Sequence, residues 1–229
     1  MILSHKHKFI FIKTEKTAGT SLEIALSEFC GPDDIITKIT ITDELKRKEL
    51  GYRTAQNYNI PFSKYVQLDW GRLLLKRRTA KFYNHMSALE VKSLVSEEVW
   101  NTYYKFSFDR NPWDKMISWY YWKNRNGGYD SIDDFMAKGM GGLVKGFDLY
   151  TIGGVKAVDD IFKYEDIPGA LKTITEKLDL PKPLEMPNYI AKGGARKEKK
   201  HYSELLSPEA VENVNIMAAR EIRLLDYRF

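Results

Sequence analysis

The segment HKFIFIKTEKTAGTSLEIAL, His7 to Leu26, decides the fold. Within it, Lys8 to Ile12 (KFIFI) is short, rich in β-branched and aromatic residues, and almost continuously hydrophobic, which predicts a buried strand. From Thr20 onward, hydroxyl side chains are followed by apolar residues at helical spacing, which predicts the start of a helix. The expected order is therefore strand, tight turn and helix.

The turn between this strand and this helix has the composition of an anion-binding loop. Backbone N–H groups at a helix N-terminus lack intrahelical partners, and the helix dipole favours negative charge there. The common phosphate loop, G-x-x-x-x-G-K-[ST], has its lysine after the glycines, whereas Lys16 precedes Gly19. The segment is therefore either a phosphate loop of another pattern or an ordinary turn with a surface lysine. The residues expected at a phosphate are Lys16, Thr17, Ala18, Gly19, Thr20 and Ser21.

A second junction between a strand and a helix lies near the middle of the chain. Tyr103 to Phe108 (YYKFSF) predicts another buried strand, and Pro112 is typical of the first turn of a helix, here one carrying residues 114–122. Arg110 closes the strand and Ser118 lies two helical turns further along, so both are able to reach an additional phosphate. Taken by itself, the sequence Arg-Asn-Pro-Trp is also typical of a capped helix start.

Strands alternating with helices predict an α/β fold with a mostly parallel sheet, in a single domain that spans residues 1–229. Ser87 and Glu90 form a capping box, which predicts a helix from there to about Ser96. Residues 72–81 have leucines at helical spacing and predict one amphipathic helix with a cationic face. Further helices are expected over residues 42–50, 168–178 and 207–225, and a strand end over 162–165.

Composition limits the class of protein. The chain has 229 residues, 43% of them hydrophobic, which suffices for a core, and a net charge of +5 suits an anionic ligand without indicating nucleic acid. The single Cys30 excludes an intramolecular disulfide. No stretch approaches the roughly 20 apolar residues that span a bilayer. These features predict a soluble intracellular protein.

Taken together, the two junctions resemble the motifs of the sulfotransferase superfamily, and most closely its carbohydrate branch, which includes heparan sulfate 2-O-sulfotransferase and bacterial relatives. The resemblance rests on Glu15 to Ser21 (EKTAGTS) and on Phe108 to Lys115 (FDRNPWDK) with Ser118, and it extends to His85 and to the closing residues 221–229 (EIRLLDYRF). It implies a three-layer fold like that of P-loop NTPases. It also implies that 3′-phosphoadenosine 5′-phosphosulfate (PAPS) donates a sulfuryl group to an acceptor hydroxyl, which we expect on a carbohydrate.

The resemblance also assigns roles to residues. The first motif would hold the 5′-phosphosulfate of the donor, with Lys16 at the bridging oxygen, and Arg110 and Ser118 would hold its 3′-phosphate. His85 is the expected general base, and its position ahead of a helix N-terminus disfavours the imidazolium form; taken alone, a single histidine is also compatible with a structural role. Lys13 either assists at the donor or is a solvated lysine, and Arg196 and Lys197 either close over the phosphates or form a solvated charge run. No metal is expected.

Two departures from the family pattern and two alternatives complete the prediction. Glu15 stands where relatives often have proline, and Lys163 where arginine is common. A P-loop-like nucleotide kinase is the first alternative; the second is a non-catalytic basic protein that binds acidic glycans or nucleic acid through residues 72–81, although the main prediction expects no nucleic acid. Because family members of animal cells usually carry a membrane anchor, the expected location is the cytoplasm, in a bacterial or viral context. The acceptor itself is not encoded in any readable motif.

Overall fold

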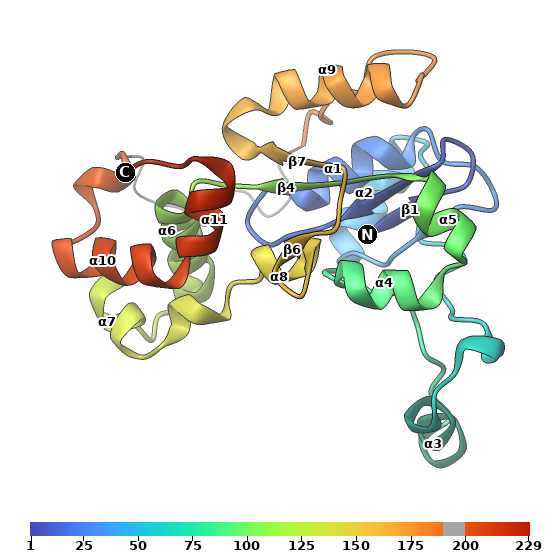
Figure 1. Cartoon of the computed structure of the whole chain (residues 1–229), viewed down its shortest axis with the longest axis horizontal. Helices are drawn as coiled ribbons and strands as arrows, with labels where there is room; N and C mark the ends of the chain where they lie inside the picture. The colour runs from blue at the N-terminus through green and yellow to red at the C-terminus, as the bar shows by residue number, and fades with distance from the viewer. Residues whose placement is uncertain (190–199) are drawn as a thin grey trace.

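The computed structural model describes residues 1–189 and 200–229. Its centre is a five-stranded sheet of order β3-β1-β2-β4-β7 (Figure 1). The strands are β1 (Ile2–Ser4), β2 (Phe9–Ile12), β3 (Ile35–Ile36), β4 (Tyr104–Asp109) and β7 (Asp160–Lys163).

The sheet is mixed, so the prediction of a mostly parallel sheet holds for only half of it. β2 and β4 are parallel, as are β4 and β7, with Phe11 opposite Phe106 and Phe108 opposite Phe162. β1 pairs antiparallel with both β2 and β3. Only four residues separate β1 from β2, which is enough for a tight turn but too few for the long crossover that joins parallel strands. The two strands are therefore antiparallel.

Alternate side chains of β2 lie on opposite faces of the sheet. Phe9 and Phe11 pack against α1 (Gly19–Ser27) and α9 (Ile167–Lys177) on one face, while Ile10 and Ile12 pack on the other. Both sets are fully buried, which explains the continuous apolar run in the sequence. The second face is covered by α4 (Ala88–Leu94), α5 (Glu97–Thr102) and α8 (Phe147–Tyr150). This arrangement is an α/β fold compatible with three layers.

A group of helices packs together beside the sheet (Figure 1). It contains α6 (Pro112–Lys123), α7 (Ile132–Ala137), α10 (Pro208–Met217) and α11 (Ala219–Leu225). The long helix predicted over 207–225 is wrong in one respect, because it breaks at Ala218 into α10 and α11. Neither Gly nor Pro marks the break. It lets Val214 and Ile222 both pack into this group while Ile216 stays exposed.

The cationic helix predicted over 72–81 is also placed differently. α3 (Gln67–Lys76) begins five residues earlier and ends where Arg77 adopts the left-handed conformation, with φ of 50°. Beyond it the backbone pairs with residues 58–60, through Ile60 N to Ala80 O at 3.0 Å and Phe82 N to Tyr58 O at 2.8 Å. This pairing overrides helical propensity over residues 78–82.

The remaining elements are short. α2 (Ile41–Glu49) packs on α1, and β5 (Thr151–Ile152) pairs with β6 (Val155–Lys156). The 3₁₀ segments are Phe62–Lys64, Asn124–Asn126, Met140–Leu143, Tyr164–Asp166 and Tyr202–Glu204. Among the described residues, no helix is long and apolar enough to cross a membrane.

Candidate functional site

The loop between β2 and α1 is shaped to present backbone N–H groups. Lys16 and Ala18 both have left-handed backbone conformations, with φ of 65° and 56°. Successive N–H groups in alternating conformations of this kind form a concave anion-binding nest. Ala18 is the N-cap of α1 and its side chain cannot cap the helix, so the first N–H groups of α1 keep their capacity to bind an anion.

The hydroxyl groups of this loop point inward rather than toward a ligand. Thr17, Thr20 and Ser21 are all buried. Thr17 Oγ1 lies 3.0 Å from Thr14 Oγ1, and the Thr14 hydroxyl donates to the carbonyl of Phe108 on β4. The prediction that these hydroxyls contact a phosphate therefore has no support from their orientation. Thr17, through Thr14, fixes the loop against the neighbouring parallel strand, and Thr20 accepts from Lys13. Anion binding at this loop is therefore assigned to the backbone.

Lys13 is a buried structural cation, so its reading as a solvated surface lysine is wrong. Its side chain is 3% exposed, and its Nζ lies 2.5 Å from Glu23 Oε2 and 3.0 Å from Thr20 Oγ1. A Cβ atom on Gly19 would approach Lys13 Cγ to 2.8 Å, so a glycine is needed where the lysine passes the start of α1. Lys13 thus stabilises the loop through its contacts with Thr20 and Glu23 of α1.

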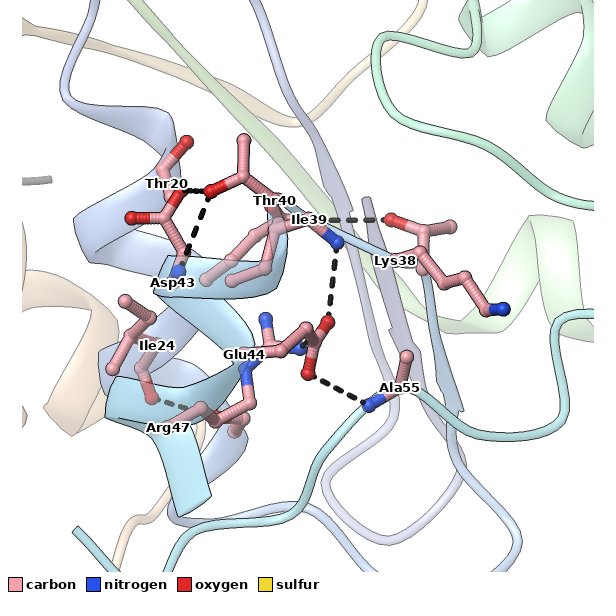
Figure 2. A network of polar contacts seen from close by, with 12 residues as sticks. Thr20, Ile24, Lys38, Ile39, Thr40, Asp43, Glu44, Arg47 and Ala55 are labelled. Atoms are coloured by element: carbon pink, nitrogen blue, oxygen red, sulfur yellow. Dashed lines mark hydrogen bonds and ion pairs between the residues drawn. The ribbon is translucent and has the colours of Figure 1, made fainter. Parts of the chain in front are cut away.

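α1 is supported by α2 on the side that carries Thr20 and Ile24. Figure 2 shows Asp43 and Arg47 of α2, and Thr40 just before the helix, facing these two residues. The Arg47 side chain is fully buried and its Nη1 lies 3.1 Å from Glu44 Oε1. This contact, together with the Glu44 bond to Ala55 N at 3.3 Å, fixes α2 against the chain that follows it.

Lys16 and Glu15 leave the loop in different directions. The Lys16 ammonium lies over the Trp122 ring of α6 at 4.8 Å, and Arg125 lies over the same ring at 4.3 Å. Glu15 is bound to Lys145, whose backbone N–H donates to Glu15 Oε2 at 2.7 Å. The Glu15 carboxylate therefore has a partner outside the loop, and it ties the loop to the segment before α8.

Arg110 links the two junctions. It follows β4, and its guanidinium donates through Nε and Nη2 to Asp114 Oδ2, at 2.8 and 2.6 Å, and through Nη1 to the Lys16 carbonyl at 3.2 Å. The Tyr164 ring lies 4.2 Å from it. Because β2 and β4 are parallel, their carboxyl ends meet at one edge of the sheet, and Arg110 reaches the loop there.

Ser118 lies on the same face of α6 as Asp114, one helical turn further on, and is half-buried. Ser118 is thus a neighbour of Asp114, the residue that Arg110 contacts, and its grouping with Arg110 stays a prediction. Arg196 and Lys197 lie outside the described residues.

His85 also lies at this edge. Its Nδ1 is 3.0 Å from the carbonyl of Lys13, the first residue after β2. A carbonyl only accepts, so Nδ1 carries the proton and the neutral ring has its lone pair on Nε2. Burial, and secondly the charge of Lys13, lowers the pKa of His85 to about 4. The imidazole is therefore neutral at pH 7, as a proton acceptor must be.

Next to His85 lies a cavity of about 590 Å³ between the segment 141–149 and the start of α6 and α11. Lys115, which lines this cavity, belongs to a buried ion pair. Lys115 Nζ lies 2.7 Å from Asp109 Oδ1, and the Tyr150 hydroxyl donates to the other oxygen of this carboxylate at 2.5 Å. Burial raises the pKa of the nearby Glu221 above its ordinary value.

The sequence reasoning did not find this cluster around Asp109. Its members are separated by up to 112 positions, and those that fall within stretches singled out above, Asp109, Lys115 and Glu221, lie in two different stretches. The cluster of Trp122 with Lys16 and Arg125 was missed for the same reason.

Metal ligands were not expected. Over residues 1–189 and 200–229, no group of three or more His, Cys, Asp or Glu side chains is arranged to hold an ion.

Comparison with known proteins adds no relative. No family model matches the chain, and no curated protein or solved structure matches it. The sulfotransferase resemblance therefore rests on the sequence motifs alone.

Proposed function

We propose that this protein is a sulfotransferase that uses PAPS to modify a hydroxyl group, and that this hydroxyl belongs to a carbohydrate. The observation that carries the proposal is the bond between Arg110 and the Lys16 carbonyl. It joins a backbone nest, which suits one phosphate, to a guanidinium, which suits a second. A donor with separate 5′- and 3′-phosphates needs two such positions.

Different residues bind the two phosphates of the donor. Backbone N–H groups of Thr17 to Ser21 hold the 5′-phosphate, and Arg110 with Ser118 holds the 3′-phosphate. The Tyr164 ring and Asp114 keep the guanidinium in place before binding. Lys13 is not assigned to the donor, because Glu23 neutralises it within the protein.

PAPS, when bound, supplies an electrophilic sulfuryl group whose departure leaves charge on the bridging phosphate oxygen. Lys16 stabilises that charge, for which its ammonium must move from the face of Trp122 toward the nest. A cation–π contact at a partly exposed site stabilises by only about 0.5–1 kcal/mol, so a phosphate competes with it readily.

His85 accepts the proton of the acceptor hydroxyl at Nε2. The bond from Nδ1 to the Lys13 carbonyl holds this tautomer and aims the ring. The acceptor enters through the adjacent cavity of about 590 Å³, which is large enough for a sugar residue. Charge on the imidazolium after transfer is favoured by the Lys13 carbonyl, which accepts a stronger bond from the cation.

Calorimetric titration without metal tests the proposal. The protein should bind 3′-phosphoadenosine 5′-phosphate, and the Arg110→Ala variant should bind it at least tenfold more weakly, because a charge-assisted bond contributes about 1.5–3 kcal/mol. Arg72→Ala is the matched control, since Arg72 is 57% exposed on α3, in a segment to which the proposal assigns no role. Binding of ATP with Mg²⁺ in place of the bisphosphate would refute the proposal and favour a nucleotide kinase.

A further inference from the structure

Residues 61–81 form an arm that carries α3 away from the rest of the molecule (Figure 1). Its base is a hydrogen-bonded neck in which Asn59 and Lys81 form an antiparallel bridge. Ile60 and Phe82, on either side of the arm, are buried in the core of the α4 face. The neck is also held by Ala80 N, which donates to the Tyr65 hydroxyl at 2.9 Å. The arm is therefore an anchored structure and not a loose loop.

The arm contains the whole net charge of the chain. It has six of the 36 Lys and Arg residues and one of the 31 Asp and Glu residues, which leaves 30 of each sign elsewhere. A cavity of about 780 Å³ lies between the arm and α4. The cations that line this cavity are Lys64, Arg72, Lys76, Arg78 and Lys81.

The arm also exposes apolar side chains that nothing in the described structure covers. Leu74 and Leu75 of α3 are 78% and 85% exposed, and Leu68 is 61% exposed. Together with Gly71, these leucines occupy one face of α3 at positions i, i+3, i+6 and i+7. Arg72 borders this face, as on helices that lie in a membrane surface. The rings of Phe62, Tyr65 and Trp70 pack on one another, although Phe62 and Trp70 are themselves 58% and 43% exposed.

We propose that the arm docks on an anionic lipid surface, with the leucine face of α3 in the outer hydrocarbon and the cations of the arm at the headgroups. A cluster of four to eight Lys and Arg residues at an amphipathic helix suits a surface rich in phosphatidylserine or similar lipids. Two of the arm's six, Arg72 and Lys76, lie on α3, and three more follow within five residues of its end. The proposal does not depend on the sulfotransferase proposal, because it uses none of the residues assigned to the donor or to His85.

Two other occupants fit less well. A soluble polyanion would satisfy the cations but would leave Leu74 and Leu75 in water. A second copy docked through the same face in a two-fold dimer would bring two strongly cationic arms together, which like-charge repulsion opposes. A lipid surface satisfies both features at once.

Vesicle sedimentation tests the proposal. The protein is mixed with vesicles of phosphatidylcholine containing 30% phosphatidylserine, and separately with pure phosphatidylcholine vesicles. We expect binding to the anionic vesicles and at least tenfold weaker binding to the neutral ones. The double variant Leu74→Gln/Leu75→Gln should lose about tenfold in vesicle affinity, and so should Arg72→Gln/Lys76→Gln.

Matched controls alter equivalent residues outside the arm. Ile41→Gln/Leu45→Gln removes two exposed apolar side chains of α2, and Lys48→Gln/Lys172→Gln removes two exposed cations. Both should bind vesicles within twofold of the unaltered protein, and circular dichroism checks that every variant is folded. Three results would overturn the proposal: no binding of the unaltered protein to anionic vesicles, full binding by the leucine variant, or a dimer at assay concentration that the leucine variant abolishes.

Discussion

Replacing His85 by glutamine should remove a defined part of the pH dependence of stability. In the folded protein the pKa of His85 is lowered to about 4, chiefly by burial, from 6.5 in the unfolded chain. Between these values the unfolded state binds the proton that the folded state excludes. Stability contributed by the neutral ring is therefore present above pH 6.5 and is lost as the pH falls toward 4.

The size of this effect follows from the two pKa values. Between pH 7 and pH 4.5, titration of His85 should lower the free energy of unfolding by about 2 kcal/mol. Urea unfolding at both pH values measures it, and the comparison of the two proteins removes the contribution of every other titrating group. The His85→Gln variant should therefore lose about 2 kcal/mol less than the unaltered protein. An equal loss in both proteins would show that His85 is protonated in the folded state near pH 6.5, and the reasoning for a neutral base would fail.

Three further predictions concern stability, each measured by urea unfolding. Glu23→Gln should cost about 3 kcal/mol at pH 7, because it leaves Lys13 buried without its charged partner. Burial alone would raise the pKa of Glu23, but the charge of Lys13 and the other contacts of this carboxylate outweigh it, and the pKa is lowered to about 2. The difference in unfolding free energy between the two proteins should therefore shrink as the pH falls below 4.5. A difference that does not change with pH would contradict the ion pair. Ser87→Ala should cost about 1 kcal/mol through loss of the N-cap of α4, and a neutral result would exclude the capping box. Lys115→Met should lower the free energy of unfolding by about 3 kcal/mol, and by less when it is made in the Asp109→Asn background. If the effects of the two substitutions simply add, Lys115 and Asp109 are not coupled.

The strand, turn and helix at the start of the chain were predictable because local signals agree there. The apolar run of β2, the hydroxyls near the start of α1 and Pro112 at the start of α6 each favour the structure that is found. The capping box of Ser87 and Glu90 is local in the same way, since both of its hydrogen bonds lie within one turn.

Other features depend on partners far away in sequence and left no local signal. In the sequence Lys13 is typical of a surface lysine, and its burial follows only from the position of Glu23 on α1. The Thr17 hydroxyl points inward because it contacts Thr14, which donates to β4. The end of α3 at Arg77 follows from pairing between residues 58–60 and 80–82, which overrides the helical spacing of the leucines. The antiparallel β1 was missed because three residues are too few to show a period.

The central claim is that Arg110 and the loop of Lys16 hold two phosphates of one donor molecule. Its most direct test is to titrate the unaltered protein and Arg110→Ala with 3′-phosphoadenosine 5′-phosphate and with adenosine 5′-phosphate. The account predicts that Arg110→Ala weakens binding of the bisphosphate at least tenfold and leaves binding of the monophosphate within twofold. An equal loss for both nucleotides would contradict it, because Arg110 would then support the loop through the Lys16 carbonyl and not bind a phosphate of its own.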